Sequence, residues 1–311
     1  MRNIFGKNVQ PGSLGIEISP FGIAIARVDR APSEGLGSCE CHYIEGANFA
    51  ENGRALKNYL SESGFEKMPT HVVLHPAMYD IYFVDRPEVD DSELDEAVKW
   101  KIKDLVDEPL KNLVVDAFGL PLDAYRGAQK KVYAVTTQRE ALEDIVNTVK
   151  NAGAQLKSVN ISELAVRNIV NLLHEDEGGA ALLRMRNSSG TINLTDSGNL
   201  YLTRNIESGI SMLESSNPSR RESVMDEMLL EIQRSLDYYD SQLGKGLIRN
   251  FLMAPTRLTD HKIDDYLSKN LGIKVHSLDV NEMFEVQETL SSELQGNCFA
   301  AIGAACSDVV H

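Results

Sequence analysis

The sequence predicts an α/β protein built from two lobes of related design, and two similar strand pairs carry this prediction. The first lies between Ser13 and Val28, where alternating Ile, Leu and Val residues flank the turn Pro20-Phe21-Gly22. This pattern is typical of a β-hairpin, which we expect at the edge of the first core sheet. The second pair, Ala181 to Met185 and Thr191 to Thr195, flanks a small polar turn in the other half. One such unit at the start of each half is the layout of two-lobed proteins with a nucleotide cleft.

The composition is that of an ordinary globular protein with an acidic surface. The 311 residues are 42% hydrophobic and 25% charged, which allows a large core in two domains or two halves of one. The net charge of −15 argues against nucleic acid or an anionic membrane as the main partner. No apolar run approaches the roughly 20 residues that span a bilayer, and the polar start does not resemble a signal peptide. We therefore expect a cytoplasmic protein.

The cysteines and histidines do not have the spacing of a metal site. The cysteines occur as C-x-C and C-x7-C, at Cys39, Cys41, Cys298 and Cys306. A tetrathiolate zinc site would need all four to converge, and this spacing is unusual for zinc, so reduced thiols are favoured. His71 and His75 lack a third ligand at suitable spacing, which favours structural roles.

The most clearly patterned helix is predicted from Asp90 to Val106. Acidic residues crowd its first turns and lysines follow, an order that complements the helix dipole. Its apolar stripe consists of Leu94, Val98, Ile102 and Leu105. Trp100, the single tryptophan, projects from nearly the opposite side of the helix. Either a neighbouring segment of the same chain covers this indole, or a partner peptide lying in a groove does.

A run of acidic residues and glycines from Glu175 to Gly179 predicts the boundary between the lobes. We therefore assign residues 1–178 to the first lobe and residues 179–311 to the second. In the second lobe, the sequence predicts a long amphipathic helix from Glu222 to Leu243 and a final helix of small residues from Cys298 to Cys306.

Several stretches together resemble the PilM family, actin-like proteins of type IV pilus assembly. The most specific stretch is AVKWKIKDLVDEPLKNLVVDAF, in which a helix with a tryptophan precedes a Pro-Leu turn and a strand. The other stretches include GIEIS…IAIARV near the start, EIQRSLDYYDSQ, and AAIGAA near the end. The resemblance covers nearly the whole chain. The short, divergent sequence favours the branch of the family that serves MSHA pili, represented by MshI.

The resemblance implies an actin-like (ribonuclease H-like) fold, with a cleft between two lobes and a small inserted α+β subdomain at about residues 68–125. It also implies a cytoplasmic protein held at the inner membrane by its partners. In the family, the N-terminal cytoplasmic tail of a bitopic PilN-type membrane protein binds in a groove beside the insert. For this partner we expect contacts with Trp100, Val84 and Lys101. Whether the chain also forms a homo-oligomer stays open.

The first nucleotide loop of the family has changed in this sequence. PilM-type chains carry an Asp-x-Gly-Ser-Ser-Ser turn and a following Lys, since phosphate needs close backbone N–H groups and magnesium needs a carboxylate. The matching stretch here begins Glu17-Ile18-Ser19, and Ala24 stands in place of the Lys. Glu17 could still hold a metal ion through water. However, Pro20 lacks a donor N–H, and Phe21 places a ring where phosphates would sit.

The second loop has changed as well. Arg184 replaces the Asp of the family and Arg186 replaces the Gly, while Ser188, Ser189 and Gly190 keep a small, polar turn. Two arginines attract anions, but they cannot replace the carboxylate that binds the metal.

The segment on the adenosine side is the third change. Met253-Ala254-Pro255-Thr256 replaces a Gly-Gly pair, so side chains stand where a purine needs close approach to the backbone. Because all three elements have changed, the sequence predicts a scaffold that uses no cofactor and has a degenerate ATPase cleft. Weak nucleotide or anion binding at the remnant loops stays open, and an active ATP-binding ATPase is the alternative. No other catalytic constellation stands out.

Overall fold

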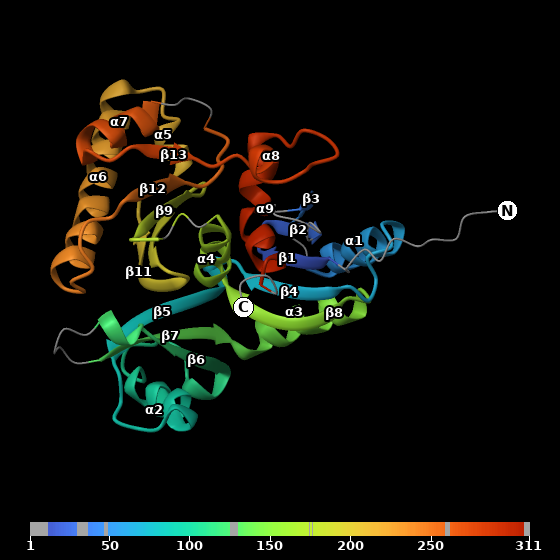
Figure 1. Cartoon of the computed structure of the whole chain (residues 1–311). Coiled ribbons are helices and arrows are strands. Elements are labelled where there is room, and N and C mark those ends of the chain that lie inside the picture. Colours follow the sequence, from blue (N-terminus) through green and yellow to red (C-terminus); the bar gives the residue numbers. More distant parts are fainter. Residues whose placement is uncertain are drawn as a thin grey trace.

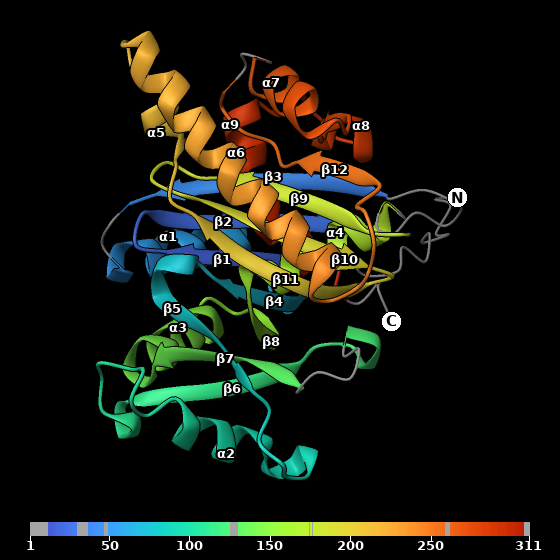
Figure 2. The same ribbon diagram turned by 90° about the vertical axis from the view of Figure 1, so that its left-hand side faces the viewer.

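The computed structural model describes residues 12–29, 37–46, 49–124, 130–173, 175, 177–258 and 262–307. In this part of the chain, two five-stranded sheets lie on either side of two central helices (Figure 1). A smaller three-stranded subdomain lies beside them, at the bottom of Figure 2. The α/β class predicted from the sequence is confirmed. The predicted outer limits of the lobes, and Asp176 at their boundary, lie outside the described residues.

The first sheet has the strand order β3-β2-β1-β4-β8. Its strands are β1 (Ser13–Ser19), β2 (Gly22–Asp29), β3 (Ser38–Glu45), β4 (Pro69–Leu74) and β8 (Gln155–Ile161). The hairpin β1–β2 forms as predicted, but its expected place at the edge of the sheet is wrong. Because β4 pairs in parallel with β1 over Leu14–Ile18, β1 is the middle strand. Glu17 therefore comes from the centre of the sheet.

The second sheet repeats this arrangement, with the order β11-β10-β9-β12-β13. Its strands are β9 (Ala180–Met185), β10 (Gly190–Asp196), β11 (Asn199–Ile206), β12 (Asn250–Met253) and β13 (Val275–Ser277). As in the first sheet, three antiparallel strands are followed by two parallel ones. The predicted second strand pair is confirmed. It places Arg184 on the middle strand of its sheet, the same position that Glu17 has in the first.

Two helices, α4 (Ser162–Leu172) and α9 (Ser292–Ala305), lie between the sheets (Figure 1). Glycines allow this close packing, since a Cβ atom at Gly15 of β1 would lie 1.7 Å from the Ala301 carbonyl oxygen of α9. A Cβ atom at Gly303 would lie 2.2 Å from the Ala165 carbonyl oxygen of α4. The small residues of AAIGAA thus serve helix packing, and α9 packs on the first sheet.

The inserted subdomain is a sheet of order β5-β7-β6 with α2 on one face (Figure 2). Its elements are β5 (Tyr79–Asp85), α2 (Leu94–Lys101), β6 (Leu113–Gly119) and β7 (Lys131–Gln138). This sheet spans residues 79–138 and differs from the predicted insert, about 68–125, at both ends. The reason is pairing: β4 joins the first lobe through β1, and β7 joins the insert between β5 and β6.

The remaining helices cover the outer faces of the sheets, except Val280–Met283, which packs into the central core cluster beside α9. They are α1 (Phe49–Glu62), α3 (Arg139–Asn151), α5 (Ile210–Leu213), α6 (Pro218–Ser241), α7 (Lys262–Leu271) and α8 (Val280–Met283). Apolar residues of α1 and α3 pack on the first sheet, and those of α6 and α7 pack on the second. Within the described ranges, no helix has the length and apolar character needed to cross a membrane.

Three helix boundaries differ from the predictions for local reasons. The helix predicted over 90–106 reduces to α2, because the chain turns back after Ile102; Leu105, assigned to the core stripe, is 55% exposed. The helix α6 begins at Pro218 rather than Glu222, since the Asn217 side chain accepts hydrogen bonds from two backbone N–H groups of its first turn. The last helix begins at Ser292 rather than Cys298, because the Ser291 side chain caps this end by accepting a hydrogen bond from the Leu294 N–H.

Candidate functional site

In the turn between β1 and β2, two backbone N–H groups donate hydrogen bonds to a side chain of the same turn. The Ser19 Oγ accepts hydrogen bonds from the N–H groups of Phe21 and Gly22, each at 3.1 Å, and donates one to the Gly22 carbonyl at 2.9 Å. Pro20 has no N–H to offer. The Phe21 ring is 63% exposed and lies edge-on to His75, with 5.7 Å between ring centroids. Two donors of this turn are therefore engaged within the loop instead of being free for a phosphate.

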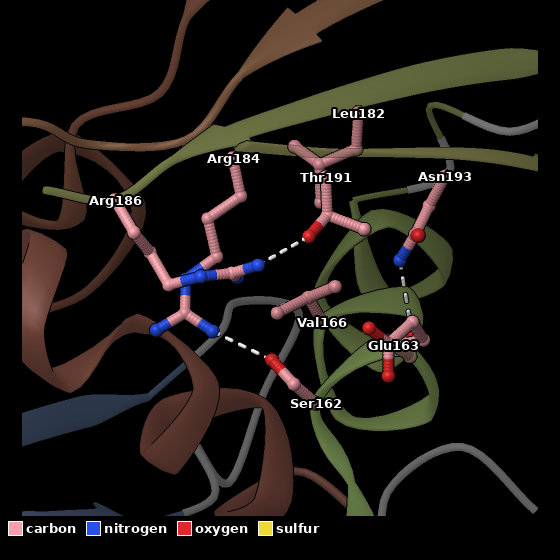
Figure 3. A pocket seen from close by; sticks show the side chains of 8 residues that line it. All are labelled: Ser162, Glu163, Val166, Leu182, Arg184, Arg186, Thr191 and Asn193. Atoms are coloured by element: carbon pink, nitrogen blue, oxygen red, sulfur yellow. Dashed lines mark hydrogen bonds between the residues drawn. The ribbon is translucent and has the colours of Figure 1, made fainter. Parts of the chain in front are cut away.

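A buried ion pair joins the middle strands of the two sheets. The Arg184 Nη2 donates to Glu17 Oε2 at 3.1 Å, and the two side chains are 7% and 4% exposed. The Arg184 Nη1 donates to the Ser162 Oγ at 2.6 Å, at the start of α4 (Figure 3). The other Glu17 oxygen, Oε1, is buried without a hydrogen-bond partner in the described part of the chain. One guanidinium thus bridges both lobes and a central helix.

Arg186 lies beside this pair. It donates to the Thr191 Oγ1, as Figure 3 shows, and its backbone N–H donates to the Ser189 carbonyl at 2.7 Å. Burial and the nearby Arg184 charge lower the pKa of Arg186. The residues of Figure 3 leave a cavity of about 10 Å³, room for about one water molecule.

The polar turn after Arg186 packs against the start of α5. A Cβ atom at Gly209 would lie 2.3 Å from the Ser188 carbonyl carbon, so the two backbones are in direct contact. Ser211 donates to the Asn187 carbonyl through both its N–H, at 3.0 Å, and its Oγ, at 2.8 Å. Ser188, Ser189 and Gly190 therefore form a fixed turn whose backbone packs on α5.

A buried carboxyl group completes the polar network. The Tyr79 hydroxyl donates to Glu163 Oε2 at 2.6 Å and accepts from the Ser162 N–H at 3.2 Å. Burial raises the pKa of Glu163, and Asn193 donates to its backbone carbonyl at 3.3 Å (Figure 3). Sequence reasoning missed both Tyr79 and Glu163, because the sequence shows them only as residues of a strand and a helix.

The segment on the adenosine side is packed against α9. Ala254 is 1% exposed and Pro255 is buried. A Cβ atom at Gly296 of α9 would lie 2.8 Å from the Pro255 carbonyl oxygen. The helix therefore occupies the space next to this backbone.

These residues do not fit magnesium and ATP. The Glu17 carboxylate is bound to Arg184, the Glu163 carboxyl accepts from Tyr79, and two N–H groups of the first turn are bound to Ser19. No group of three or more His, Cys, Asp and Glu residues in the described ranges is arranged to hold a metal ion. The ion pair of Glu17 and Arg184 joins the two lobes.

A larger cavity of about 390 Å³ opens between the insert and the second lobe. Tyr133 and Phe83 line it from the insert, while Arg186 and Arg204 line it from the second lobe. Asp80 and Glu163 also reach it, so its charges are mixed. Its volume suits a small ligand.

A second open site lies on the other side of the insert, between β6 and α3. This groove has a volume of about 380 Å³ and is lined by Val114, Arg139, Leu142, Glu143, Val146 and Asn147. Among the described residues β6 forms a ladder only with β7, so no strand covers its outer edge. Side chains of the chain itself bind two of its backbone groups, since the Leu113 carbonyl accepts from Arg139 at 3.1 Å and the Ala117 N–H donates to Asp95 at 3.0 Å. Sequence reasoning missed this groove, because Leu142 and Val146 read as an ordinary helix face; their i, i+4 spacing was the available signal.

The structure does not bring the three expected partner-contact residues onto one surface. Trp100 is 61% exposed on α2, where its Nε1 donates to Glu96 at 3.0 Å, so the expectation that a neighbouring segment covers it is wrong. Lys101 is also exposed. Val84 packs instead into the small core between α2 and the inserted sheet. All three lie on the α2 side of that sheet, whereas α3 lies on the other (Figure 2).

Comparisons with known proteins identify the fold. No family model matches the sequence, and no curated protein matches it. Among solved structures, that of a PilM-PilN type IV pilus biogenesis complex is similar, with a TM-score of 0.71 and 18% identity over 94% of this chain and 97% of the other. A Bacteroides thetaiotaomicron protein with an actin-like ATPase fold and unknown function gives 0.53, at 11% identity over 89% and 93%.

The cytoplasmic domain of EpsL, an inner-membrane component of the type II secretion system of Vibrio cholerae, gives a TM-score of 0.50. Its identity is 12% over 93% of this chain and 94% of the other. These likenesses show that the chain has the actin-like ATPase fold, as the sequence resemblance implied.

Proposed function

We propose that this protein is a cytoplasmic scaffold of type IV pilus assembly, whose groove between β6 and α3 binds the tail of a PilN-type inner-membrane protein. The observation that carries the proposal is this open groove, beside an edge of β6 that pairs with no other strand in the described part of the chain. It contrasts with a cleft between the lobes that the protein's own side chains fill.

The groove has the features of a site for an extended peptide. An edge strand offers backbone N–H and C=O groups to an added strand, and neighbouring side chains select its residues. Val114, Leu142 and Val146 are partly exposed and supply an apolar lining. Arg139 and Glu143 add one charge of each sign. We therefore expect the bound segment to be extended and to insert apolar side chains towards α3.

The fold supports the kind of partner. A PilM protein of the same fold is found in a complex with PilN, and the likeness extends over 94% of this chain. The sequence resemblance also places the PilN-type tail beside the insert. Within this function, we propose the MSHA branch, on the divergence of the sequence, and a location at the inner membrane through the partner.

The cleft supports a role without ATP hydrolysis. Its three nucleotide elements are engaged by Arg184, by Ser19 and by the packing of α9. To bind there, a nucleotide would have to break the buried ion pair of Glu17 and Arg184 and displace α9. Only after these changes would its phosphates meet available N–H donors. We propose a degenerate ATPase cleft whose internal contacts join the lobes.

A peptide-binding assay tests the groove. A fluorescein-labelled peptide of the cytoplasmic tail of the PilN-type protein from the same genome is titrated with the protein, and anisotropy is measured. Leu142→Asp should weaken binding at least about tenfold, since it puts a charge into an apolar contact. Trp100→Ala is the matched control and should bind like the wild type.

The outcomes separate two sites. Loss of binding in Trp100→Ala, with binding kept in Leu142→Asp, would move the partner to the exposed face of α2. No binding by the wild-type protein would reject the scaffold proposal. Comparison with tails from MSHA and other type IV systems tests the branch, and the MSHA tail should bind most tightly.

Isothermal titration with Mg-ATP tests the cleft, and titration with inorganic phosphate tests the arginines that line the 390 Å³ cavity. We expect no micromolar binding of ATP and no hydrolysis. Micromolar binding with turnover would show an active ATPase and overturn this part of the proposal.

A further inference from the structure

The four cysteines of the chain gather in one region of the fold, although they are far apart in the sequence. Cys39 and Cys41 lie on β3, Cys298 lies in α9, and Cys306 follows its last residue. All four belong to or pack against the core cluster around α9. They are all in the described part of the chain, and none forms a disulfide. Neither the groove nor the cleft uses them.

Two of these thiols are close enough to react with each other. The Sγ atoms of Cys39 and Cys41 are 3.7 Å apart. Residues two apart on a strand have Cα atoms about 6.6 Å apart, which is within the upper part of the range for disulfides. The strand β3 is the last strand of its sheet, and on its outer side the Cys39 N–H donates to the Glu285 carbonyl at 2.9 Å.

The surroundings give the two thiols different reactivity. The neighbouring thiols of Cys298 and Cys39 lower the pKa of Cys41, which is also partly exposed. The same contact with Cys41, together with burial, raises the pKa of Cys39, which is 3% exposed. Cys298 is buried, with its Sγ 3.5 Å from the His42 carbonyl oxygen. Cys41 is therefore the thiol that a reagent meets first, because it is partly exposed whereas Cys39 and Cys298 are buried.

We propose that Cys41 and Cys39 form a thiol–disulfide exchange site that reacts with small-molecule disulfides such as oxidised glutathione. The Cys41 thiolate attacks one sulfur of the glutathione disulfide, whose S–S bond breaks and releases one glutathione thiolate. Cys39 then loses its proton and attacks the Cys41 Sγ, which breaks the mixed disulfide and releases the second glutathione. In total the protein loses two protons and two electrons, and one glutathione disulfide takes them up and becomes two glutathiones.

Peptide mapping of the full-length protein after incubation with oxidised glutathione tests this pairing. Trypsin places Cys39 and Cys41 together in the peptide 31–54, and Cys298 and Cys306 together in the peptide 275–311. The free thiols are alkylated before digestion. We expect the peptide 31–54 to lose two hydrogens and to resist alkylation, while the peptide 275–311 is alkylated at both thiols.

Variants define the order of the steps. Cys39→Ser should stop at a mixed disulfide of glutathione on Cys41, and Cys41→Ser should slow the reaction at least about tenfold. Cys306→Ser is the matched control and should react like the wild type. The mapping of the wild-type protein decides the pairing even if a variant folds poorly.

Three results would overturn the proposal. The first is a cross-link between the peptides 31–54 and 275–311, which would make Cys298 or Cys306 the reacting partner. The second is a wild-type protein that keeps four alkylatable thiols. The third is a metal bound in stoichiometric amount that protects the cluster from alkylation.

Discussion

The cleft between the lobes and the groove between β6 and α3 differ in how their side chains are paired or exposed. In the cleft, Arg184 meets Glu17 and Ser162, and Tyr79 meets Glu163. In the groove, Leu142 and Val146 remain partly exposed beside the outer edge of β6. The polar groups of the cleft are thus paired within the chain, whereas apolar side chains of the groove stay partly exposed.

This contrast indicates which surface of this actin-like fold is available to a partner. A buried charge must be paired, so the new arginine of β9 and the carboxylate of β1 stabilise each other. The apolar lining of the groove still lies open to an added segment. The prediction is a protein whose lobes are fastened together while its insert recruits a partner.

The largest expected effect is in the cleft, on removal of Arg184. Arg184→Met should lower the free energy of unfolding by about 3–5 kcal/mol, because Glu17 would be left buried and unpaired. The double variant Glu17→Gln/Arg184→Met should recover much of this loss, and urea unfolding measures both. A cost below about 1 kcal/mol for Arg184→Met would show that the pair does not fasten the lobes.

A smaller effect concerns pH, through His75 at the rim of the cleft. Burial lowers the pKa of His75 to about 4, opposed by Glu17 and assisted by Arg184 and Arg186, and its Nδ1 accepts from the Ala77 N–H at 3.1 Å. Because the folded protein favours the neutral ring, this contribution to stability is present above about pH 6.5 and is lost as the pH falls towards 4. The loss is at most about 3 kcal/mol.

The variant His75→Asn keeps an acceptor for the Ala77 N–H but cannot titrate. The difference in unfolding free energy between wild type and variant should therefore shift against the wild type as the pH falls from 7 to 4. A difference that stays constant over this range would mean that His75 is accessible to protons in the folded protein.

Peptide binding in the β6–α3 groove should be independent of the contact between the insert and the second lobe. Lys245 of the second lobe bonds Asp123 of the insert at 2.7 Å and Asp196 at 2.8 Å, so the insert is tied to that lobe. Asp123→Asn should cost about 0.5–1 kcal/mol of stability, as a partly exposed pair does. Peptide affinity should stay within about twofold, since β6 and α3 alone form the groove. A larger loss of affinity would show that the groove depends on the second lobe.

Much of the fold was predictable because its signals are local. The two strand pairs and their turns lie within short segments, so alternation and turn residues predicted them. The place of β1 at the centre of its sheet was not predictable in this way, since it depends on pairing with β4. The limits of the insert were not predictable for the same reason, because they depend on the pairing of β4 with β1 and of β7 with β5 and β6.

The sites were less predictable, since their parts meet only in three dimensions. Glu17 and Arg184 are 167 positions apart, and the sequence showed only that each loop had changed, without showing that the two changes pair. The groove depends on the distance between β6 and α3 in the folded protein, and the periodicity of the sequence gives no information about that distance. Trp100 attracted attention as the single tryptophan, yet its position on α2 separates it from the groove.

The smallest expected effect is therefore that of Trp100→Ala. The indole is 61% exposed and bonds only to Glu96 among the described residues, so its removal should change the unfolding free energy by about 0.5 kcal/mol or less. With the partner peptide in the β6–α3 groove, affinity should stay within about twofold of the wild type. An affinity loss of tenfold or more, with unchanged stability, would place the partner on α2 and reverse the contrast drawn between groove and cleft. Tryptophan fluorescence gives an independent reading, because a peptide in the groove leaves this indole in water and its emission unshifted.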